Sequence, residues 1–401
     1  MCIQRYVYTE TPVVENREQA INLIMPREVR IMKVCFILTH VPNPRINKRI
    51  DTLKRIADTK VICTRRASQD IWEPSQDVEH FIFDIDLPSA THILKRYIIS
   101  QDFQRKALLK LEEIKPDVIY AEGMDPLIIA EGYKQHNSVK IIFEVADLRE
   151  SYIVKPSKWT EKLILNALLR KEKKIFGAVD YLIVTSPKFY DAHFYTLISR
   201  DRMLYIPNMP NQEAFMNYKR KEKGPFTIGF IGGIRYLMQM KLLVDAANEI
   251  GADVLFAGAG GTISQYEEIQ RYCEGMNNVK FTGKYNYDSE IAGIYGKVDT
   301  VFAVYDADNP NVCIALPNKL YESIICELPI IVAKGTYLSE LVDEWGVGVS
   351  VNHKSKQEYV DTFRKLKDDA EYYQAMVDKC KVLKDGLIHS DWKDQLAKLV
   401  E

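Results

Sequence analysis

The stretch LPNKLYESIICELPIIVA, residues 316–333, has the residue order of a loop, a short helix and a buried strand. Pro317 suits the first position of the helix, because its missing N–H group costs nothing there. Apolar side chains recur at helical spacing from Tyr321 to Leu328, so one face of the helix can pack on a sheet. We therefore expect a unit of an α/β fold in which the opposite face of the helix is free to bind a ligand.

The start of this helix carries groups that suit an anion. Free amide groups at a helix N-terminus point toward negative charge, and Lys319 adds a cation beside them. Glu322 lies one turn deeper on the face of Lys319, where its carboxylate could accept hydrogen bonds from two adjacent hydroxyl groups, as on a ribose. A diphosphate next to such hydroxyls describes a nucleotide, so we expect Asn318, Lys319 and Glu322 to bind one.

The composition is that of an ordinary globular protein. The chain has 401 residues, of which 47% are hydrophobic and 27% charged, which allows two or three domains. Its net charge of −1 provides no basic field for nucleic acid, so we expect no nucleic-acid partner. The seven cysteines are odd in number, scattered and without a Cys-x-x-Cys pair, which indicates reduced thiols and a cytoplasmic location.

Nothing in the chain has the pattern of a signal peptide or a membrane span. No apolar run approaches 18 residues, and acidic side chains occur where a signal peptide needs an apolar core. The first expected strand begins near Lys33. We therefore treat residues 1–31 as a loosely ordered N-terminal extension and assign it no function.

Short apolar runs alternate with helical stretches twice along the chain, which predicts parallel sheets covered on both faces. In the first half we expect strands at 34–38, 60–64, 117–121, 139–143 and 181–185, and helices near 46–57, 91–115, 126–136 and 158–177. After the charged linker 219–225 we expect strands at 226–231, 253–257, 279–282, 300–305, 329–333 and 347–351. The expected fold is α/β, with two tandem Rossmann-like doubly wound domains and a binding cleft between them.

Two glycine loops follow strands of the second half. Gly232 and Gly233 precede Arg235, and Lys241 lies six residues farther on, so backbone and cations could meet a phosphate there. Residues 257–261 form a second permissive loop, with Gly258 and Gly260. Each loop alone is as consistent with a plain strand-to-helix turn.

Taken together and in order, these motifs resemble the donor domain of the retaining nucleotide-sugar glycosyltransferases of the GT-B fold, in the fourth family. The family's Arg and Lys six apart fall on Arg235 and Lys241, and its Glu-bearing helix on the segment with Lys319 and Glu322. The resemblance covers about residues 32–400. It implies an N-terminal acceptor domain at 32–210, joined by a C-terminal helix at 388–401, and a donor domain at 222–387.

The resemblance also implies an activity and a set of site residues. The expected reaction moves a sugar from a UDP- or GDP-linked donor to a glycan or lipid-linked acceptor, with retention and without a metal, as in polysaccharide biosynthesis. The implied residues are, for catalysis, Arg235, Lys241 and Asp147; for the donor, Gly232, Gly233, Gly258, Gly260, Lys284, Asn318, Lys319 and Glu322; and on the acceptor side His40, Arg45 and Glu122.

Two positions depart from the family pattern. Ile314 stands where the family has the first glutamate of a pair, and Ala146 stands where relatives commonly have a histidine. One alternative is therefore a degenerate nucleotide-sugar-binding or scaffold protein without transfer activity. Another alternative is a sugar-nucleotide 2-epimerase on the same double fold, although the helix with Lys319 and Glu322 fits the transferases better.

Two Asp-x-Asp runs could in principle hold a divalent cation, at residues 84–86 and 306–308. Neither has a His or Glu neighbour in the sequence, so we expect no metal site.

One helical stretch suggests contact with a membrane surface. Residues 158–174 combine Trp and Leu side chains with many lysines, as in helices that lie in a headgroup layer. A second expected helix of this half adds basic residues, namely Lys95, Arg96, Arg105, Lys106 and Lys110. The alternative is that the leucines pack on the sheet while the lysines face water.

Overall fold

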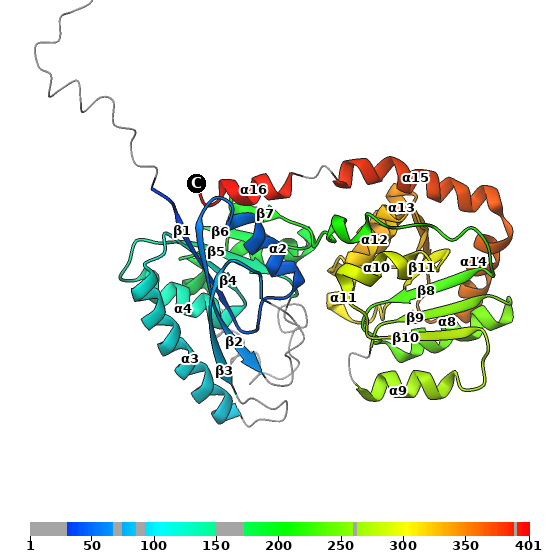
Figure 1. Cartoon of the computed structure of the whole chain (residues 1–401), viewed down its shortest axis with the longest axis horizontal. Coiled ribbons are helices and arrows are strands. Elements are labelled where there is room, and N and C mark those ends of the chain that lie inside the picture. The colour runs from blue at the N-terminus through cyan, green and yellow to red at the C-terminus, as the bar shows by residue number, and fades with distance from the viewer. Residues whose placement is uncertain are drawn as a thin grey trace, which may run out of the picture.

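The computed structural model describes residues 30–66, 74–85, 93–148, 170, 172–259, 263–388 and 391–401. Two parallel sheets lie side by side, each covered by helices (Figure 1). This confirms the expected α/β architecture with two doubly wound sheets.

The first sheet has seven parallel strands in the order β3-β2-β1-β4-β5-β6-β7. Its strands are β1 (Lys33–Leu38), β2 (Asp58–Arg66), β3 (Glu79–Ile85), β4 (Val118–Glu122), β5 (Lys140–Val145), β6 (Tyr181–Val184) and β7 (Met203–Tyr205). The strand order reverses between β1 and β4, where Phe36 pairs with Tyr120. A crevice at such a reversal is the usual ligand site of open α/β sheets.

Helices of the first half flank this sheet: α2 (Pro44–Leu53), α3 (Ile93–Ile114), α4 (Met124–Lys134) and α7 (Pro187–Ala192). Short 3-10 turns follow at Phe194–Thr196, Arg200–Arg202 and Gln212–Phe215. α2 begins where the sequence provides a cap, because the Asn43 side chain accepts the Ile46 N–H and Pro44 takes the first helical position. The buried Ile46, Ile50 and Leu53 then fix α2 against the core.

The second sheet has six strands in the order β10-β9-β8-β11-β12-β13, again all parallel. They are β8 (Thr227–Ile231), β9 (Asp253–Ala257), β10 (Val279–Gly283), β11 (Thr300–Ala303), β12 (Ile330–Ala333) and β13 (Gly348–Val351). The helices are α8 (Leu237–Glu249), α9 (Ile263–Tyr272), α10 (Tyr287–Tyr295), α11 (Pro310–Ile314), α12 (Asn318–Ile325), α13 (Tyr337–Trp345), α14 (Lys356–Asp368) and α15 (Ala370–Ile388). The order reverses between β8 and β11, which places a second crevice there.

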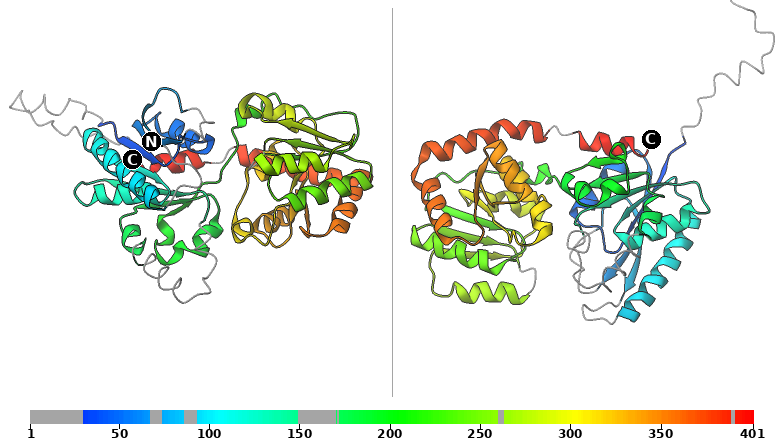
Figure 2. Two further views of the ribbon diagram at one scale, coloured as in Figure 1. Left: turned by 90° about the horizontal axis from the view of Figure 1, so that it is seen from below. Right: turned by 180° about the vertical axis from the view of Figure 1, so that it is seen from behind.

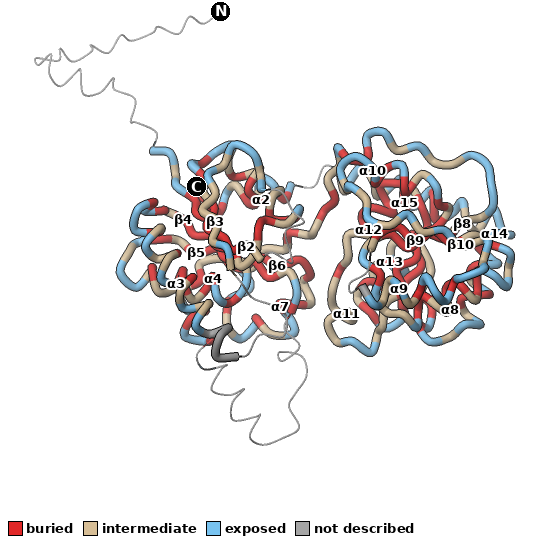
Figure 3. The backbone as a smooth tube through the Cα atoms, turned by 60° about the horizontal axis from the view of Figure 1, so that its bottom comes forward, coloured by how far each residue is buried: buried red, intermediate tan, exposed pale blue. Residues whose placement is uncertain are grey.

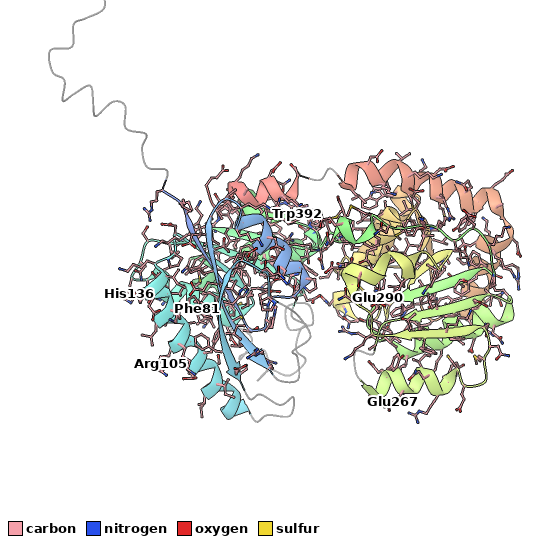
Figure 4. The ribbon with its side chains drawn as sticks, in the orientation of Figure 1. Phe81, Arg105, His136, Glu267, Glu290 and Trp392 are labelled. Atoms are coloured by element: carbon pink, nitrogen blue, oxygen red, sulfur yellow. The ribbon has the colours of Figure 1, made fainter. Side chains whose placement is uncertain are left out.

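The chain crosses between the two halves twice, once after β7 and once between α15 and α16 (Trp392–Lys398) (Figure 2). α16 returns to the first half and packs against α2. The Arg49 guanidinium lies 4.7 Å from the centre of the Trp392 ring, and Trp392 is labelled on α16 in Figure 4. Arg49 also donates to the carbonyl oxygens of Ile206 and Pro207 in the other crossing, at 3.2 and 3.5 Å. One buried side chain therefore holds both connections.

The buried residues of each half are concentrated in its strands, and exposed residues lie on the helices and loops around them (Figure 3). Every residue of β1 apart from Lys33 is buried, as expected for a strand covered on both faces.

The structure differs from the expected elements in several places. β3 and β7 were not predicted, and Pro317 caps α12, which begins at Asn318. α11 is an additional short helix. Most of the predicted helix at 158–177 lies outside the described residues, as do residues 1–29. Within the described parts of the chain, no helix is long and apolar enough to cross a membrane.

Candidate active site

The crevice of the second sheet is formed by two touching glycine loops. Gly232 and Gly258 have φ values of +132° and +126°, which side chains rarely adopt. A Cβ atom on Gly258 would lie 2.2 Å from the Gly232 carbonyl oxygen, so the two loops approach as closely as they do only because Gly258 has no side chain. The Gly232 N–H donates to the Ala257 carbonyl oxygen at 2.7 Å. Gly260 lies outside the described residues.

Lys319 reaches into this crevice from the first turn of α12. Its ammonium lies 5.3 Å from the ring centre of Phe230, on β8, and 5.6 Å from that of Tyr305, which follows β11. A Cβ atom on Gly232 would lie only 2.8 Å from Lys319 Nζ. The structure therefore brings together the cation, the helix start at Asn318 and the glycine loop.

The other basic residues implied by the resemblance are placed differently. Arg235 is exposed in the loop after Gly233, and Lys284 is exposed just after β10. Lys241 pairs with Glu268 on α9 at 2.8 Å and lies 5.2 Å from the ring centre of Tyr272. A carboxylate of α9 thus neutralises Lys241 here, which differs from the expected pairing of this cation with a diphosphate.

Glu322 does not face the open crevice, contrary to the sequence-based expectation. It is 4% exposed, and its carboxylate accepts hydrogen bonds from the hydroxyl groups of Tyr287 and Tyr295, both at 2.6 Å. Burial, then the charge of Glu322, raises the pKa of each phenol. The helical period correctly put Lys319 and Glu322 near one face, but α10 covers the inner part of that face.

The crevice of the first sheet holds a buried cluster of charges. Glu122 ends β4, and its carboxylate contacts Arg45 at the start of α2 and lies 3.3 Å from His40 Nε2, just after β1. Arg45 also donates to Glu144, a buried residue of β5. The structure therefore brings together the three residues expected on the acceptor side. Arg45 is only 6% exposed, so most of its surface is covered by protein.

Sequence reasoning missed Glu144, although a charge inside the otherwise apolar β5 sequence KIIFEV was a signal. Its carboxylate accepts hydrogen bonds from Arg45 and the Tyr120 hydroxyl and lies 3.5 Å from Arg49. Burial alone would raise the pKa of Glu144, but the two guanidinium groups outweigh it and lower the pKa to about 2. Glu144 is therefore a charged anchor that fixes Arg45.

The His40 ring is held by contacts at both of its nitrogen atoms. Its Nδ1 lies 2.8 Å from the Val41 carbonyl oxygen and its Nε2 faces Glu122, so both ring nitrogens meet acceptors. Burial lowers the pKa of His40, but the hydrogen bond and charge of Glu122 outweigh it, and the pKa is raised overall. These contacts make His40 a group that orients Glu122 and not a general base.

Asp147 lies exposed after β5, and its Oδ1 accepts a hydrogen bond from Asn311 Nδ2 of α11 at 3.3 Å. This contact joins the two halves of the chain. Asn311 was not predicted from the sequence.

The second Asp-x-Asp run has a histidine neighbour after all. His353, just after β13, lies 3.3 Å from Asp306 and 3.7 Å from Asp308, and the three could surround a cation. The His353 Nδ1 atom already accepts the Ala307 N–H at 3.2 Å, and Lys354 pairs with Asp308. These contacts occupy His353 Nδ1 and Asp308 Oδ2, whereas His353 Nε2 and Asp308 Oδ1 face each other at 3.7 Å. The first run, residues 84–86, is partly outside the described residues.

Comparison with known proteins identifies the second half. Residues 211–382 match the model of the glycosyl transferases group 1 family. The succinoglycan biosynthesis protein ExoL of Rhizobium meliloti (strain 1021) is 22% identical over 249 residues, which are 59% of this chain and 60% of the relative. The O-antigen chain mannosyltransferase C of Escherichia coli is 24% identical over 195 residues, 47% of this chain and 50% of the relative. The chain thus aligns with 60% of the length of the first relative and 50% of the second.

Solved structures share the fold over nearly the whole chain. A sucrose-phosphate synthase from Thermosynechococcus elongatus has a TM-score of 0.68 at 15% identity, covering 92% of this chain and 98% of its own. Anabaena HepE in complex with UDP and glucose has a TM-score of 0.66 at 14% identity, with the same coverage. A UDP-GlcNAc 2-epimerase from Neisseria meningitidis follows at 0.56 and 13% identity, covering 90% of this chain and 100% of its own. Residues 211–382 of this chain are thus similar to the glycosyl transferases group 1 family, and the chain as a whole has the GT-B fold.

Proposed function

We propose that this protein is a glycosyltransferase that moves a sugar from a nucleoside-diphosphate sugar to a glycan or lipid-linked acceptor. The observation that carries the proposal is the position of Lys319 at the start of α12, against the Gly232 loop. A fixed cation, free amides and an approachable backbone are the groups that a diphosphate requires. The role of the succinoglycan and O-antigen relatives favours a polysaccharide or lipopolysaccharide product.

The proposed mechanism depends on charge and position. Lys319 and the first amides of α12 bind the diphosphate, and Arg235 closes over it from the Gly233 loop. As the bond to the anomeric carbon breaks, these donors stabilise the charge on the departing phosphate oxygen. That oxygen takes the proton of the attacking acceptor hydroxyl on the same face of the sugar, which retains the anomeric configuration without a metal. Most of the acceleration comes from the alignment of donor and acceptor.

The acceptor binds, in this proposal, at the crevice of the first sheet. His40, Arg45 and Glu122 line the acceptor site, and Asp147 accepts a hydrogen bond from a hydroxyl group of the donor sugar or the acceptor. The buried Glu144 keeps Arg45 in place, and Glu122 raises the pKa of His40. The roles of Gly258, Gly260 and Lys284 remain those expected for loops around the nucleotide. Glu322 supports α12 through Tyr287 and Tyr295 instead of binding the ribose.

The nucleotide of the donor is UDP or GDP in this proposal. HepE is described in complex with UDP and with UDP-glucose, and one relative is named a mannosyltransferase. For the location we propose the cytoplasm, because the described cysteines are free thiols.

Contact with a membrane surface remains a smaller part of the proposal. Of the basic residues on α3, Arg105 and Lys106 both pair with Asp102, and Lys110 pairs with Glu113. These pairs reduce the charge that α3 offers to anionic lipids. The stronger candidate, residues 158–174, is mostly outside the described residues.

The competing function is a nucleotide-sugar-binding protein without transfer activity, which the replacement of the family's glutamate by Ile314 favours. The test is to incubate the protein with UDP- and GDP-sugars and glycan or lipid-linked acceptors, and to measure released nucleoside diphosphate and glycosylated product. Transfer by the wild type that Lys319→Ala lowers by about 10- to 100-fold supports the enzyme. Tight nucleotide binding without product in any acceptor pool would favour the binding protein. Conversion of a UDP-sugar to its 2-epimer would instead indicate an epimerase.

A further inference from the structure

The segment 309–316 of the second half reaches across to the first half. Asn309 caps α11 by accepting the Asn311 N–H at 2.9 Å. From this turn the Asn311 side chain makes two bonds with the end of β5: its Oδ1 accepts the Leu148 N–H at 3.2 Å, and its Nδ2 donates to Asp147 Oδ1 at 3.3 Å. One side-chain amide therefore binds the carboxylate of Asp147 and the backbone N–H of Leu148.

The end of α11 is held to the same region. The Ser186 hydroxyl donates to the Ile314 carbonyl oxygen at 2.5 Å. Ile314 and Ala315 pack against the hydrophobic cluster of the first half, which includes Leu148. The side chain at position 314 thus serves the contact between the halves, which gives a physical role to the residue that departs from the family pattern.

Asp147 lies near the donor loop as a result. Burial raises the pKa of the Tyr236 phenol, and the Asp147 carboxylate contributes to the rise, so Asp147 is within electrostatic reach of the loop that carries Arg235. Asn311 takes only Oδ1 of Asp147, which leaves Oδ2 to accept a hydroxyl of the substrate.

We propose that Asn311 is a positioning residue that holds Asp147 in register with the donor site, an inference that rests on the proposed transferase function. Asp147 belongs to the half that binds the acceptor, whereas Asn311 belongs to the half that binds the nucleotide. The Asp147 carboxylate therefore reaches its position beside the reacting sugar only when α11 is docked against the first half. Asn311 thereby couples the docking of α11 to the placement of the carboxylate.

The test compares Asn311→Ala with Ser186→Ala, which loosens the docking of α11 without touching Asp147. Nucleoside-diphosphate affinity is measured by calorimetry, and kcat and the acceptor KM by product formation. For Asn311→Ala we expect unchanged nucleotide affinity and a kcat about tenfold lower, because one hydrogen bond to a charged group is lost. For Ser186→Ala we expect a much smaller effect on kcat. Equal losses in both variants, or a normal kcat in Asn311→Ala, would overturn the proposal.

A double variant that exchanges the two side chains separates the effect of the carboxylate's position on activity from its effect on the stability of the protein. Asn311→Asp places two carboxylates side by side, so its activity should fall and partly recover at lower pH, as one of them takes a proton. In Asp147→Asn/Asn311→Asp the amide and the carboxylate exchange places, and the Leu148 N–H keeps an acceptor. This double variant should regain the thermal stability lost in Asn311→Asp. It should not regain the activity, because residue 147 no longer offers a carboxylate to the substrate. Full activity in the double variant would contradict the role of Asp147. A wild type that binds no nucleotide would instead refute the proposed function itself.

Discussion

Lys319 and Gly232 are in such close contact that a methyl group on the glycine would displace the lysine: a Cβ atom there would lie 2.8 Å from Lys319 Nζ. Lys319 comes from α12, and Gly232 follows β8, so the contact joins two elements far apart in the sequence. The family motif and the crevice between β8 and β11 meet at this point.

Gly232→Ala should therefore lower the affinity for a nucleoside diphosphate by about tenfold, because the new methyl group displaces the ammonium from the phosphate site. The positive φ adds a cost of about 1–2 kcal/mol to the free energy of folding. Gly275→Ala is the matched control, since its φ is +82° but nothing lies within 4 Å of the added Cβ atom. Calorimetry on both variants checks this, and equal affinity in the two would contradict the contact.

Glu322→Ala should destabilise the protein more than it weakens nucleotide binding. It leaves the phenols of Tyr287 and Tyr295 without their acceptor, at about 1–3 kcal/mol for each buried donor. Glu322→Gln is the control, because it keeps the volume and one acceptor oxygen. Denaturant unfolding measures the difference. If Glu322→Ala unfolds like the wild type but binds nucleotide poorly, Glu322 faces the ligand as the sequence first suggested.

The His40–Glu122 pair should make stability depend on pH. Since the folded state raises the pKa of His40 above 6.5, the protonated histidine binds Glu122 more strongly than in the unfolded chain. The contribution is complete below about pH 6.5 and is lost as the pH rises through the raised value.

The measurement is the unfolding free energy of the wild type minus that of His40→Gln, from pH 5.5 to about pH 9. The difference should shrink with rising pH. His136→Gln, at an exposed position after α4 that Figure 4 labels, controls for the loss of a histidine elsewhere. A difference that stays flat or grows with pH would mean that His40 is neutral in the folded protein.

Transfer should survive chelation, because the charge of the diphosphate is assigned to Lys319, Arg235 and the start of α12. Activity with EDTA should equal activity without it, and the product should keep the anomeric configuration of the donor. An enzyme silenced by EDTA and restored by manganese would return Asp306, Asp308 and His353 to consideration, and Asp308→Asn would then abolish the restoration.

The sequence predicted the strands around both crevices because local pattern determines them. Each of β1, β4, β8 and β11 is a short apolar run, and the glycines after β8 mark the closest approach of two loops. The pattern EHFIFDI of β3 alternates less clearly, so the sequence does not predict this strand. Local pattern also gave the start of α12 correctly within one residue.

The contacts that orient the site could not be predicted, since they come from distant elements. Tyr295 covers Glu322 only because α10 packs beside α12, and His353 reaches Asp306 only because β11 and β13 end at the same edge of the sheet. Asn311 meets Asp147 only when the two halves dock. Helical and strand periods identify the face on which a residue lies, but they do not show what covers it.

The central claim is that a nucleoside diphosphate binds between the Gly232 loop and the start of α12. Its most direct test is calorimetric titration of UDP and GDP into the wild type and Lys319→Ala. We expect one of the two to bind the wild type, and Lys319→Ala to lose about 1.5–3 kcal/mol of binding free energy while unfolding at an unchanged temperature. If neither nucleotide binds the folded wild type, or if Lys319→Ala binds as tightly as the wild type, the site is not where this account places it.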